Sequence, residues 1–323
     1  MPSLSAAELI DVSPSLEIFL EDVLAGLRAS PKRLPSKYLY DERGSQLFER
    51  ICELEEYYPT RVELGIMRRS AREMADAIGS RARLVEYGSG ASVKTRLLLD
   101  ALHEPAAYVP VDISGDHLQQ VADRLAAAHP EIEVLPVCAD FTRPFDVPVP
   151  GGAFSRTAVY FPGSTIGNFS HAQAESLLAQ IARQCQAGGG LLIGIDLQKD
   201  VSTIEAAYND REGVTAEFNL NLLARINREL DADFDLDGFT HLAPYDQQAN
   251  RIEMHLVSQR DQTVRVADEP IQFRRGESIC TEHSHKYTIE GFAEMAARAG
   301  LALEKVWTDA SRYFAVLYFS VTA

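Results

Sequence analysis

The stretch RLVEYGSGASVK, residues 83–94, carries the clearest fold signal in this chain of 323 residues. A short apolar run ends in Gly88-Ser89-Gly90, and residues suited to a helix follow. A strand, a glycine turn and a helix in that order are typical of a βαβ unit in a parallel sheet. The dinucleotide fingerprint requires a third glycine where this chain has Val93, so a pyrophosphate site is disfavoured.

Strands and helices continue to alternate along the chain after this stretch. Further strands are predicted at residues 107–111, 133–138, 157–161 and 191–195. Residues 301–308 and 313–321 predict two closing strands that pair antiparallel. Before the first strand, Thr60 and Glu63 have the spacing of a capping box and predict the start of a helix. We therefore predict an α/β fold, a doubly wound, Rossmann-like sheet closed by an antiparallel strand pair.

The alternation stops between residues 199 and 286. This segment predicts a helix at 215–230 and a half-buried strand at 251–260, where apolar and polar residues alternate. It is predicted to form an inserted α+β lobe. The predicted core comprises residues 61–198 and 287–323, and the predicted lobe comprises residues 1–60 and 199–286.

Charge and composition exclude several classes of partner. The net charge of −16, with basic residues clustered only in pairs, argues against nucleic acid. The apolar run at 314–319 is far shorter than the ~18 residues of a membrane-spanning helix. The four cysteines are scattered, and the first basic residue is Arg28, so we expect reduced thiols in a cytoplasmic protein without a signal peptide. We also expect a monomer.

Two acidic residues follow neighbouring strands at the edge where ligands bind in open parallel sheets. Asp112 ends the second strand, where a carboxylate can accept hydrogen bonds from both hydroxyls of a ribose. Asp140 and Phe141 end the third, where an acid and an aromatic ring can hold an adenine. Either aspartate alone is better explained as a helix N-cap, but two at successive strand ends favour a nucleoside site.

Two other motifs are poor candidates for metal sites. The run at 233–238 resembles the start of a calcium loop, but its twelfth position is Pro244 where a bidentate glutamate is needed. His283 and His285 are two residues apart and would lie on one face of a strand, but they have no third ligand nearby in the sequence. We therefore predict no bound metal.

Six motifs in order then identify a family that the chain closely resembles from about Pro31 to Phe319. Together with the glycine loop and the two acids, they resemble the L-histidine Nα-methyltransferases of ergothioneine biosynthesis, which are class I S-adenosylmethionine methyltransferases. The motifs are YLYDERGS at 38–45, EYYPTR at 56–61, GSTIGNF at 163–169, AYND at 207–210, RIEMHL at 251–256 and TEHS at 281–284.

This resemblance implies a class I methyltransferase core with a substrate-binding lobe, and methylation of L-histidine to the trimethylated betaine hercynine. It assigns S-adenosylmethionine to Tyr40, Gly88, Lys94, Asp112, Asp140 and Phe141. It assigns the amino acid head of the substrate to Tyr58, Asn168 and Tyr208, and the imidazole to Glu282 and Ser284, with Met254 nearby.

The reaction needs an uncharged amine rather than a strong base, so no catalytic base is assigned. Relatives that methylate other aromatic amino acids leave another amino acid or small amine as the alternative substrate, although Met254 and Glu282 favour histidine. A nucleotide-dependent oxidoreductase and a non-catalytic nucleoside-binding module are weaker alternatives. The interrupted glycine fingerprint disfavours the oxidoreductase, and the complete set of substrate residues disfavours the binding module.

Overall fold

The computed structural model describes residues 9–90 and 93–322, which divide into two compact units. The first unit comprises residues 1–13, 59–198 and 286–323, and the second comprises residues 14–58 and 199–285. Ala91 and Ser92 of the glycine-loop stretch lie outside the described residues.

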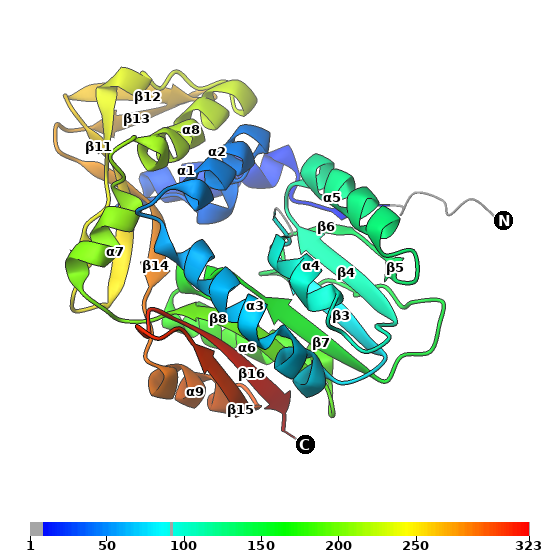
Figure 1. Cartoon of the computed structure of the whole chain (residues 1–323). Helices are drawn as coiled ribbons and strands as arrows, with labels where there is room; N and C mark the ends of the chain where they lie inside the picture. The colour runs from blue at the N-terminus through cyan, green and yellow to red at the C-terminus, as the bar shows by residue number, and fades with distance from the viewer. Residues whose placement is uncertain (1–8, 91–92, 323) are drawn as a thin grey trace. The chain divides into compact units, whose positions relative to one another are not determined.

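The first unit is built on a nine-stranded sheet with the order β1-β6-β4-β3-β7-β8-β16-β15, in which β5 also pairs with β4 (Figure 1). Its strands are β1 (Ile10–Val12), β3 (Ala82–Tyr87), β4 (Ala107–Asp112), β5 (Glu133–Val134), β6 (Val137–Ala139), β7 (Arg156–Phe161), β8 (Gly190–Asp196), β15 (Leu301–Thr308) and β16 (Phe314–Val321). Its helices are α3 (Tyr58–Ile78, whose first residue belongs to the second unit), α4 (Val93–Leu99), α5 (Gly115–Ala128), the 3₁₀ turn η2 (Thr165–Asn168), α6 (His171–Cys185) and α9 (Ile289–Arg298).

Helices cover both faces of this sheet, as the doubly wound prediction requires. Ile66 and Met67 of α3, with residues of α4 and α5, pack on the face that includes Leu84 of β3. Residues of α6 and α9 pack on the opposite face, which includes Val85 (Figure 1). The central strands pair parallel, whereas β16 pairs antiparallel with both β8 and β15. The predicted α/β sheet with its closing antiparallel pair is confirmed.

Three sequence predictions need correction in this unit. The strand predicted at 133–138 is two short strands, because Pro136 has no backbone N–H to donate to a ladder. Residues 1–60 were predicted to belong wholly to the lobe, but Ile10–Val12 pairs parallel with β6 and extends the core sheet. Glu63 is not a capping-box residue, because α3 already begins at Tyr58. Its side chain is fully buried and contacts Lys94 and Gly163 instead.

The second unit combines helices with a five-stranded sheet of order β10-β11-β14-β2, with β9 on β11. Its strands are β2 (Lys32–Arg33), β9 (Phe239–Leu242), β10 (Tyr245–Asp246), β11 (Arg251–Ser258) and β14 (Ser278–His285), and β12 (Gln262–Val266) and β13 (Glu269–Phe273) form a separate hairpin. Its helices are α1 (Leu16–Arg28), η1 (Ser36–Leu39), α2 (Glu42–Glu53), α7 (Val201–Tyr208), α8 (Val214–Glu229) and η3 (Leu236–Gly238). The alternating burial of β11 confirms the half-buried strand predicted there.

A buried carboxylate lies near the end of β3. Glu86 is 1% exposed and accepts hydrogen bonds from the Thr95 hydroxyl at 2.8 Å and from the Tyr108 hydroxyl at 2.5 Å. Burial raises the pKa of Glu86 to about 8, although both hydrogen bonds oppose that shift. The folded protein therefore holds a proton here over a pH range in which the unfolded chain has released it.

Stability should fall as pH rises from about 4.5 to about 8, because the folded state binds the Glu86 proton more tightly than the unfolded state. The variant Glu86→Gln lacks this proton, so its unfolding free energy should decline less over that range, by up to ~1.4 kcal/mol per pH unit. Denaturant unfolding of both proteins at pH 5, 6, 7 and 8 measures the difference. Parallel pH curves for the two proteins would contradict this assignment.

Gly190 begins β8 where there is no room for a side chain. A Cβ at this position would lie 2.5 Å from the Tyr318 hydroxyl and 2.7 Å from the Phe319 carbonyl oxygen. Gly190→Ala should therefore destabilise the protein by ~1–3 kcal/mol, as overpacked cores do. Thermal unfolding should show a lower Tm for this variant, with Gly152→Ala as the matched control because a Cβ there meets nothing within 4 Å. Equal Tm values for the two variants would refute the crowding argument.

Candidate functional site

The loop after β3 leaves open space beside its glycines. Gly88 and Gly90 have φ values of +72° and +40°, a backbone region in which glycine is least strained. A Cβ built on either residue would meet no atom of the described residues within 4 Å, its chain neighbours aside. The Gly88 N–H donates to the Val111 carbonyl at 2.8 Å and holds the loop to β4. Within the described residues, the backbone of both glycines is therefore uncovered on the side where a Cβ would lie.

Asp112 ends β4 beside this loop. Its carboxylate accepts hydrogen bonds from the backbone N–H of Gly90 at 3.4 Å and of Ser114 at 3.1 Å. Burial raises the pKa of Asp112, against the effect of these two bonds. A carboxylate fixed at the edge of an open loop has the chemistry needed to accept hydrogen bonds from a ribose diol.

Asp140 and Phe141 follow β6 and are both anchored. The Asp140 carboxylate accepts hydrogen bonds from the backbone N–H of Thr142 at 3.0 Å and from its hydroxyl. The Phe141 ring stacks on Tyr87, with 5.1 Å between ring centroids, and meets Phe161 edge-on at 5.5 Å. Tyr87 lies next to Gly88 in sequence, so the aromatic pair places Phe141 near the glycine loop.

Lys94 forms an ion pair with a residue that the sequence analysis assigned another role. Its Nζ lies 2.6 Å from Oε2 of Glu63, whose side chain is fully buried. The Gly163 N–H donates to both oxygens of the same carboxylate, at 3.0 and 3.1 Å. A Thr-x-x-Glu pattern after a proline reads as a helix start, so the sequence offered no signal for this contact 31 residues away.

The loop after β7 leads to Asn168 through an unusual backbone. Gly163 and Ser164 have φ values of +77° and +59°, and the second is uncommon for a residue with a side chain. Ser164 uses that side chain, because its hydroxyl accepts a hydrogen bond from the Asp196 N–H at 2.8 Å. The turn η2 then ends at Asn168. The strained loop is thus held from two sides, by Glu63 and by β8.

In the second unit, strand register determines which residues share a face. Met254 pairs with Glu282, and Ile252 pairs with Ser284, in the antiparallel ladder between β11 and β14. Side chains alternate along a strand, so Met254, Glu282 and Ser284 lie on one face. His283 pairs with Glu253 and faces the other side. The structure therefore separates His283 from the residues predicted to bind the imidazole.

Tyr208 lies on the same side as Ser284. Its hydroxyl donates to Ser284 Oγ at 2.7 Å, and its ring meets Tyr57 edge-on at 6.2 Å. All three residues are buried or nearly so, and burial raises the pKa of Tyr57 well above its ordinary value. A tyrosine predicted for the amino acid head and a serine predicted for the imidazole are therefore in direct contact.

A buried polar network orients these strands and α8. Asn219 is fully buried, and its Oδ1 accepts a hydrogen bond from the Thr281 hydroxyl at 2.6 Å. Its Nδ2 lies 3.0 Å from Nδ1 of His241, to which it can donate. Nε2 of His241 lies 2.8 Å from the Tyr208 carbonyl oxygen, so this nitrogen carries the proton. Burial lowers the pKa of His241, which agrees with this neutral form. The network thus fixes the backbone of Tyr208 and the residue before Glu282.

Tyr58 has a cationic neighbour that the sequence analysis did not identify. Lys199 Nζ donates to the Tyr58 hydroxyl at 2.7 Å and lies 4.4 Å from the centroid of its ring. The two residues are 141 positions apart, so no local pattern pointed to this pair. The Tyr58 hydroxyl is therefore an acceptor for a cationic donor in this structure.

The predicted cofactor residues do not all lie in one unit. Gly88, Lys94, Asp112, Asp140 and Phe141 belong to the first unit, but Tyr40 belongs to the second, where it meets Phe48 and Phe218 edge-on. The predicted substrate residues also divide, with Asn168 in the first unit and Tyr58, Tyr208, Met254, Glu282 and Ser284 in the second. The role of each remains a prediction.

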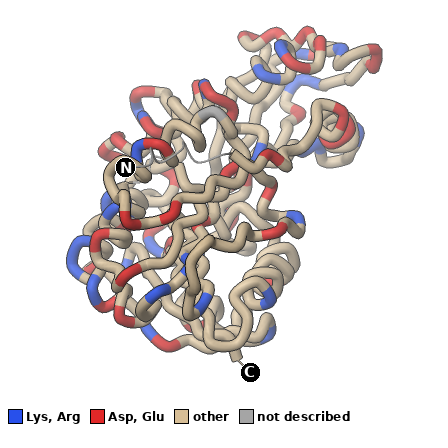
Figure 2. Tube along the Cα trace, turned by 90° about the vertical axis from the view of Figure 1, so that its right-hand side faces the viewer, with Lys and Arg blue, Asp and Glu red and all other residues tan. Residues whose placement is uncertain are grey.

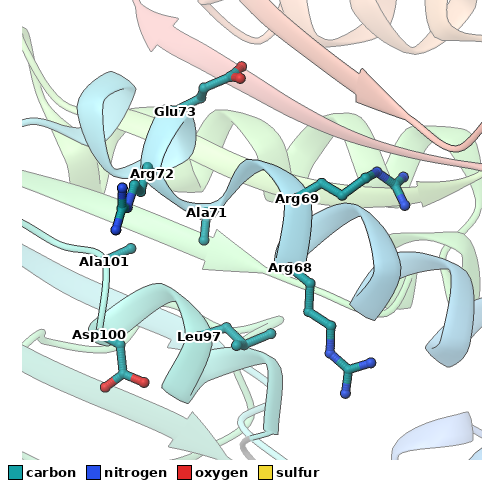
Figure 3. Close-up of a pocket in the computed structure, with 8 residues that line it drawn as sticks. All are labelled: Arg68, Arg69, Ala71, Arg72, Glu73, Leu97, Asp100 and Ala101. Carbon is teal, nitrogen blue, oxygen red and sulfur yellow. The ribbon is translucent and has the colours of Figure 1, made fainter.

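A surface hollow in the first unit contains none of these residues. It is lined by Arg68, Arg69, Ala71, Arg72, Glu73, Leu97, Asp100 and Ala101. Figure 3 shows the three arginine side chains pointing in different directions, so they do not converge on one anion. Along the described trace, acidic and basic residues are interspersed (Figure 2).

The described residues include no cluster of three or more histidine, cysteine or acidic side chains suited to a metal ion. In the acidic run at 233–238, Asp233 contacts Arg265 and Asp235 contacts Arg260. Both acids are thus used in ion pairs with arginines at the surface. No helix in the described part of the chain is both long and apolar enough to cross a membrane.

Comparisons with known proteins give a consistent result. A family described as "Histidine-specific methyltransferase, SAM-dependent" matches residues 19–321. Histidine N-alpha-methyltransferase of Mycolicibacterium smegmatis is 43% identical over 95% of this chain and 96% of that protein. Ergothioneine biosynthesis protein 1 of Neurospora crassa is 32% identical over 96% of this chain and 36% of that protein.

Among solved structures, a possible exported protein from Bordetella parapertussis has a TM-score of 0.51 and 11% identity, over 96% of this chain and 98% of that one. At this identity the likeness concerns the fold alone. The family match spans nearly all of the described chain, including both units. The chain therefore belongs to the family of S-adenosylmethionine-dependent, histidine-specific methyltransferases.

Proposed function

We propose that this enzyme transfers methyl groups from S-adenosylmethionine to the α-amino nitrogen of L-histidine and forms hercynine in three steps. The observation that supports this most directly is that Met254, Glu282 and Ser284 lie on one face of the β11–β14 ladder. The Tyr208 hydroxyl donates a hydrogen bond to Ser284 on that face. This face combines an acid, a hydroxyl and an apolar thioether, which together suit the N–H groups and flat ring of an imidazole.

The first unit fits S-adenosylmethionine. The open glycine loop would admit the nucleoside, Asp112 would accept hydrogen bonds from the ribose, and Asp140 with Phe141 would hold the adenine. When bound, S-adenosylmethionine supplies a methyl group on a positively charged sulfur with a neutral leaving group. The remaining task of the protein is to present the amine in line with that methyl at roughly 3–3.5 Å.

The substrate amine must be uncharged to react. The α-amino group of a peptide titrates near pH 7.7–8.0. In free histidine the adjacent carboxylate is ionised and makes the amine more basic, so only a small fraction is neutral near pH 8, and we assign no dedicated base. Tyr58, Asn168 and Tyr208 would orient the amine and the carboxylate. Lys199 supports this role for Tyr58, because its ammonium holds the Tyr58 hydroxyl in place and brings a positive charge next to it. Water can remove a proton between steps.

We further propose that the enzyme acts in the cytoplasm as a monomer on free histidine and uses no metal. The described cysteines Cys52, Cys138, Cys185 and Cys280 are all free thiols, which suits a reducing compartment. Methyl transfer from a sulfonium to nitrogen needs no Lewis acid, because the leaving group is already neutral.

Asp112→Ala should weaken binding of S-adenosylhomocysteine at least ~10-fold, because hydrogen bonds to a charged acceptor contribute ~1.5–3 kcal/mol each. Titration calorimetry of the wild type and the variant measures the effect. The Tm of the unliganded variant should change little, which separates lost binding from lost folding. Unchanged affinity would remove Asp112 from the cofactor site.

Glu282→Ala should lower kcat/KM for histidine by ~10- to 150-fold, because a buried hydrogen bond to a carboxylate contributes ~1.5–3 kcal/mol. The ratio of kcat/KM for histidine to kcat/KM for tryptophan or phenylalanine should also fall. Steady-state kinetics with each amino acid, and mass spectrometry of the products, test both effects. The matched control is His283→Ala, which alters the next residue on the opposite face and should leave the preference for histidine intact. A Glu282→Ala variant within about threefold of wild type would refute the assignment.

A further inference from the structure

We propose that Glu63 is a positioning residue that orients Lys94 toward the amino acid end of S-adenosylmethionine. This inference rests on the proposed function and on contacts within the first unit alone. If Asp112 takes the ribose and Asp140 with Phe141 takes the adenine, the methionyl end remains to be held. That end carries a carboxylate, and Lys94 is the cation among the predicted cofactor residues of this unit.

The burial of the two partners is unequal. The Glu63 side chain is 0% exposed and the Lys94 side chain is 20% exposed, so Lys94 is the more accessible partner of the pair. An ammonium group has three N–H donors, and the bond to Glu63 does not exhaust them. The ammonium of Lys94 is therefore held by Glu63 through one hydrogen bond and keeps N–H donors for a ligand carboxylate.

The surrounding backbone is shaped for this carboxylate. A Cβ at Gly194 of β8 would lie 2.4 Å from Glu63 Oε1, so a larger residue would force the acid to move. A Cβ at Gly163 would lie 3.5 Å from Lys94 Nζ. Burying a carboxylate is costly unless it is paired and hydrogen-bonded, and here one ammonium and one backbone N–H provide both.

One acid thus joins three segments that have different predicted tasks. Glu63 extends from α3, Lys94 from the helix after the glycine loop, and Gly163 from the loop that leads to Asn168. Lysine has a long, flexible side chain, and fixing such a side chain in advance lowers the entropy lost on binding. The Glu63 carboxylate supplies that preorganisation and also sets the position of the Asn168 loop.

The test compares two ligands that differ only in the amino acid end. S-adenosylhomocysteine carries it, whereas 5′-methylthioadenosine keeps the nucleoside and sulfur without it. Calorimetry with Glu63→Gln should show at least tenfold weaker binding of S-adenosylhomocysteine, equivalent to about 1.4 kcal/mol. Binding of methylthioadenosine should stay within twofold of wild type.

Two further variants keep the test valid if Glu63→Gln folds poorly. Lys94→Met should show the same selective loss, and Glu63→Asp, which keeps the charge but shortens the side chain, should show a smaller one. The double variant Glu63→Gln/Lys94→Met should lose no more affinity for S-adenosylhomocysteine than Lys94→Met alone. Glu63 acts through Lys94, so removing it has no further effect once Lys94 is gone. The matched control is Glu175→Gln, which breaks the exposed ion pair with Arg298 and should change neither affinity.

Three results would overturn the inference. Equal losses for both ligands would mean that Glu63 only supports the fold. An unchanged or tighter affinity of Glu63→Gln for S-adenosylhomocysteine would mean that the acid competes for Lys94 rather than positioning it. A wild-type protein that binds neither ligand would contradict the proposed function itself, and this outcome is distinct from the other two.

Discussion

Parallel pairing of β4, β3, β7 and β8 is the constraint on which the first unit depends. Parallel strands end at the same edge, so residues that follow different strands are gathered there although they are far apart in sequence. Glu86, Asp112 and Gly163 all lie near such ends. Backbone hydrogen bonds that define the sheet therefore also set the spacing of polar groups at its edge, and helices on both faces keep that sheet rigid.

Most of this fold could be predicted because its signals are local. Apolar runs of five to seven residues separated by helical periodicity specify buried parallel strands, and the alternation along β11 specifies a half-exposed one. The exceptions are also local. Ile10–Val12 is three residues long and mostly exposed, so it has no hydrophobic pattern, and Pro136 divides a run that otherwise reads as one strand.

The candidate site could be predicted only in part. The glycine loop and Asp112 have positions fixed by their own strands, so their spacing was informative. Glu63 and Lys199 were missed because their importance lies in partners 31 and 141 residues away, and each also fits an ordinary local role. Contacts of this kind depend on tertiary packing, which overrides the local pattern that a capping box suggests. Asp140 and Phe141 were identified in the same way as Asp112, from their place after a strand, whereas the family resemblance supplied Tyr40, Lys94 and the substrate residues.

The alternation of side chains along β14 has a consequence for how this protein can change over time. Glu282 and Ser284 point to one face, whereas His283 lies beside Glu253 on the other. Residues that are adjacent in the sequence therefore lie in separate environments. Substitutions at His283 can adjust charge and stability while the opposite face keeps its chemistry. Replacements at Glu282 or Ser284 alter that chemistry while leaving the ladder of backbone hydrogen bonds intact. Under the proposed function, a strand built this way lets substrate preference diverge among descendants without a change of fold. A single-residue insertion within the strand would exchange its two faces at once.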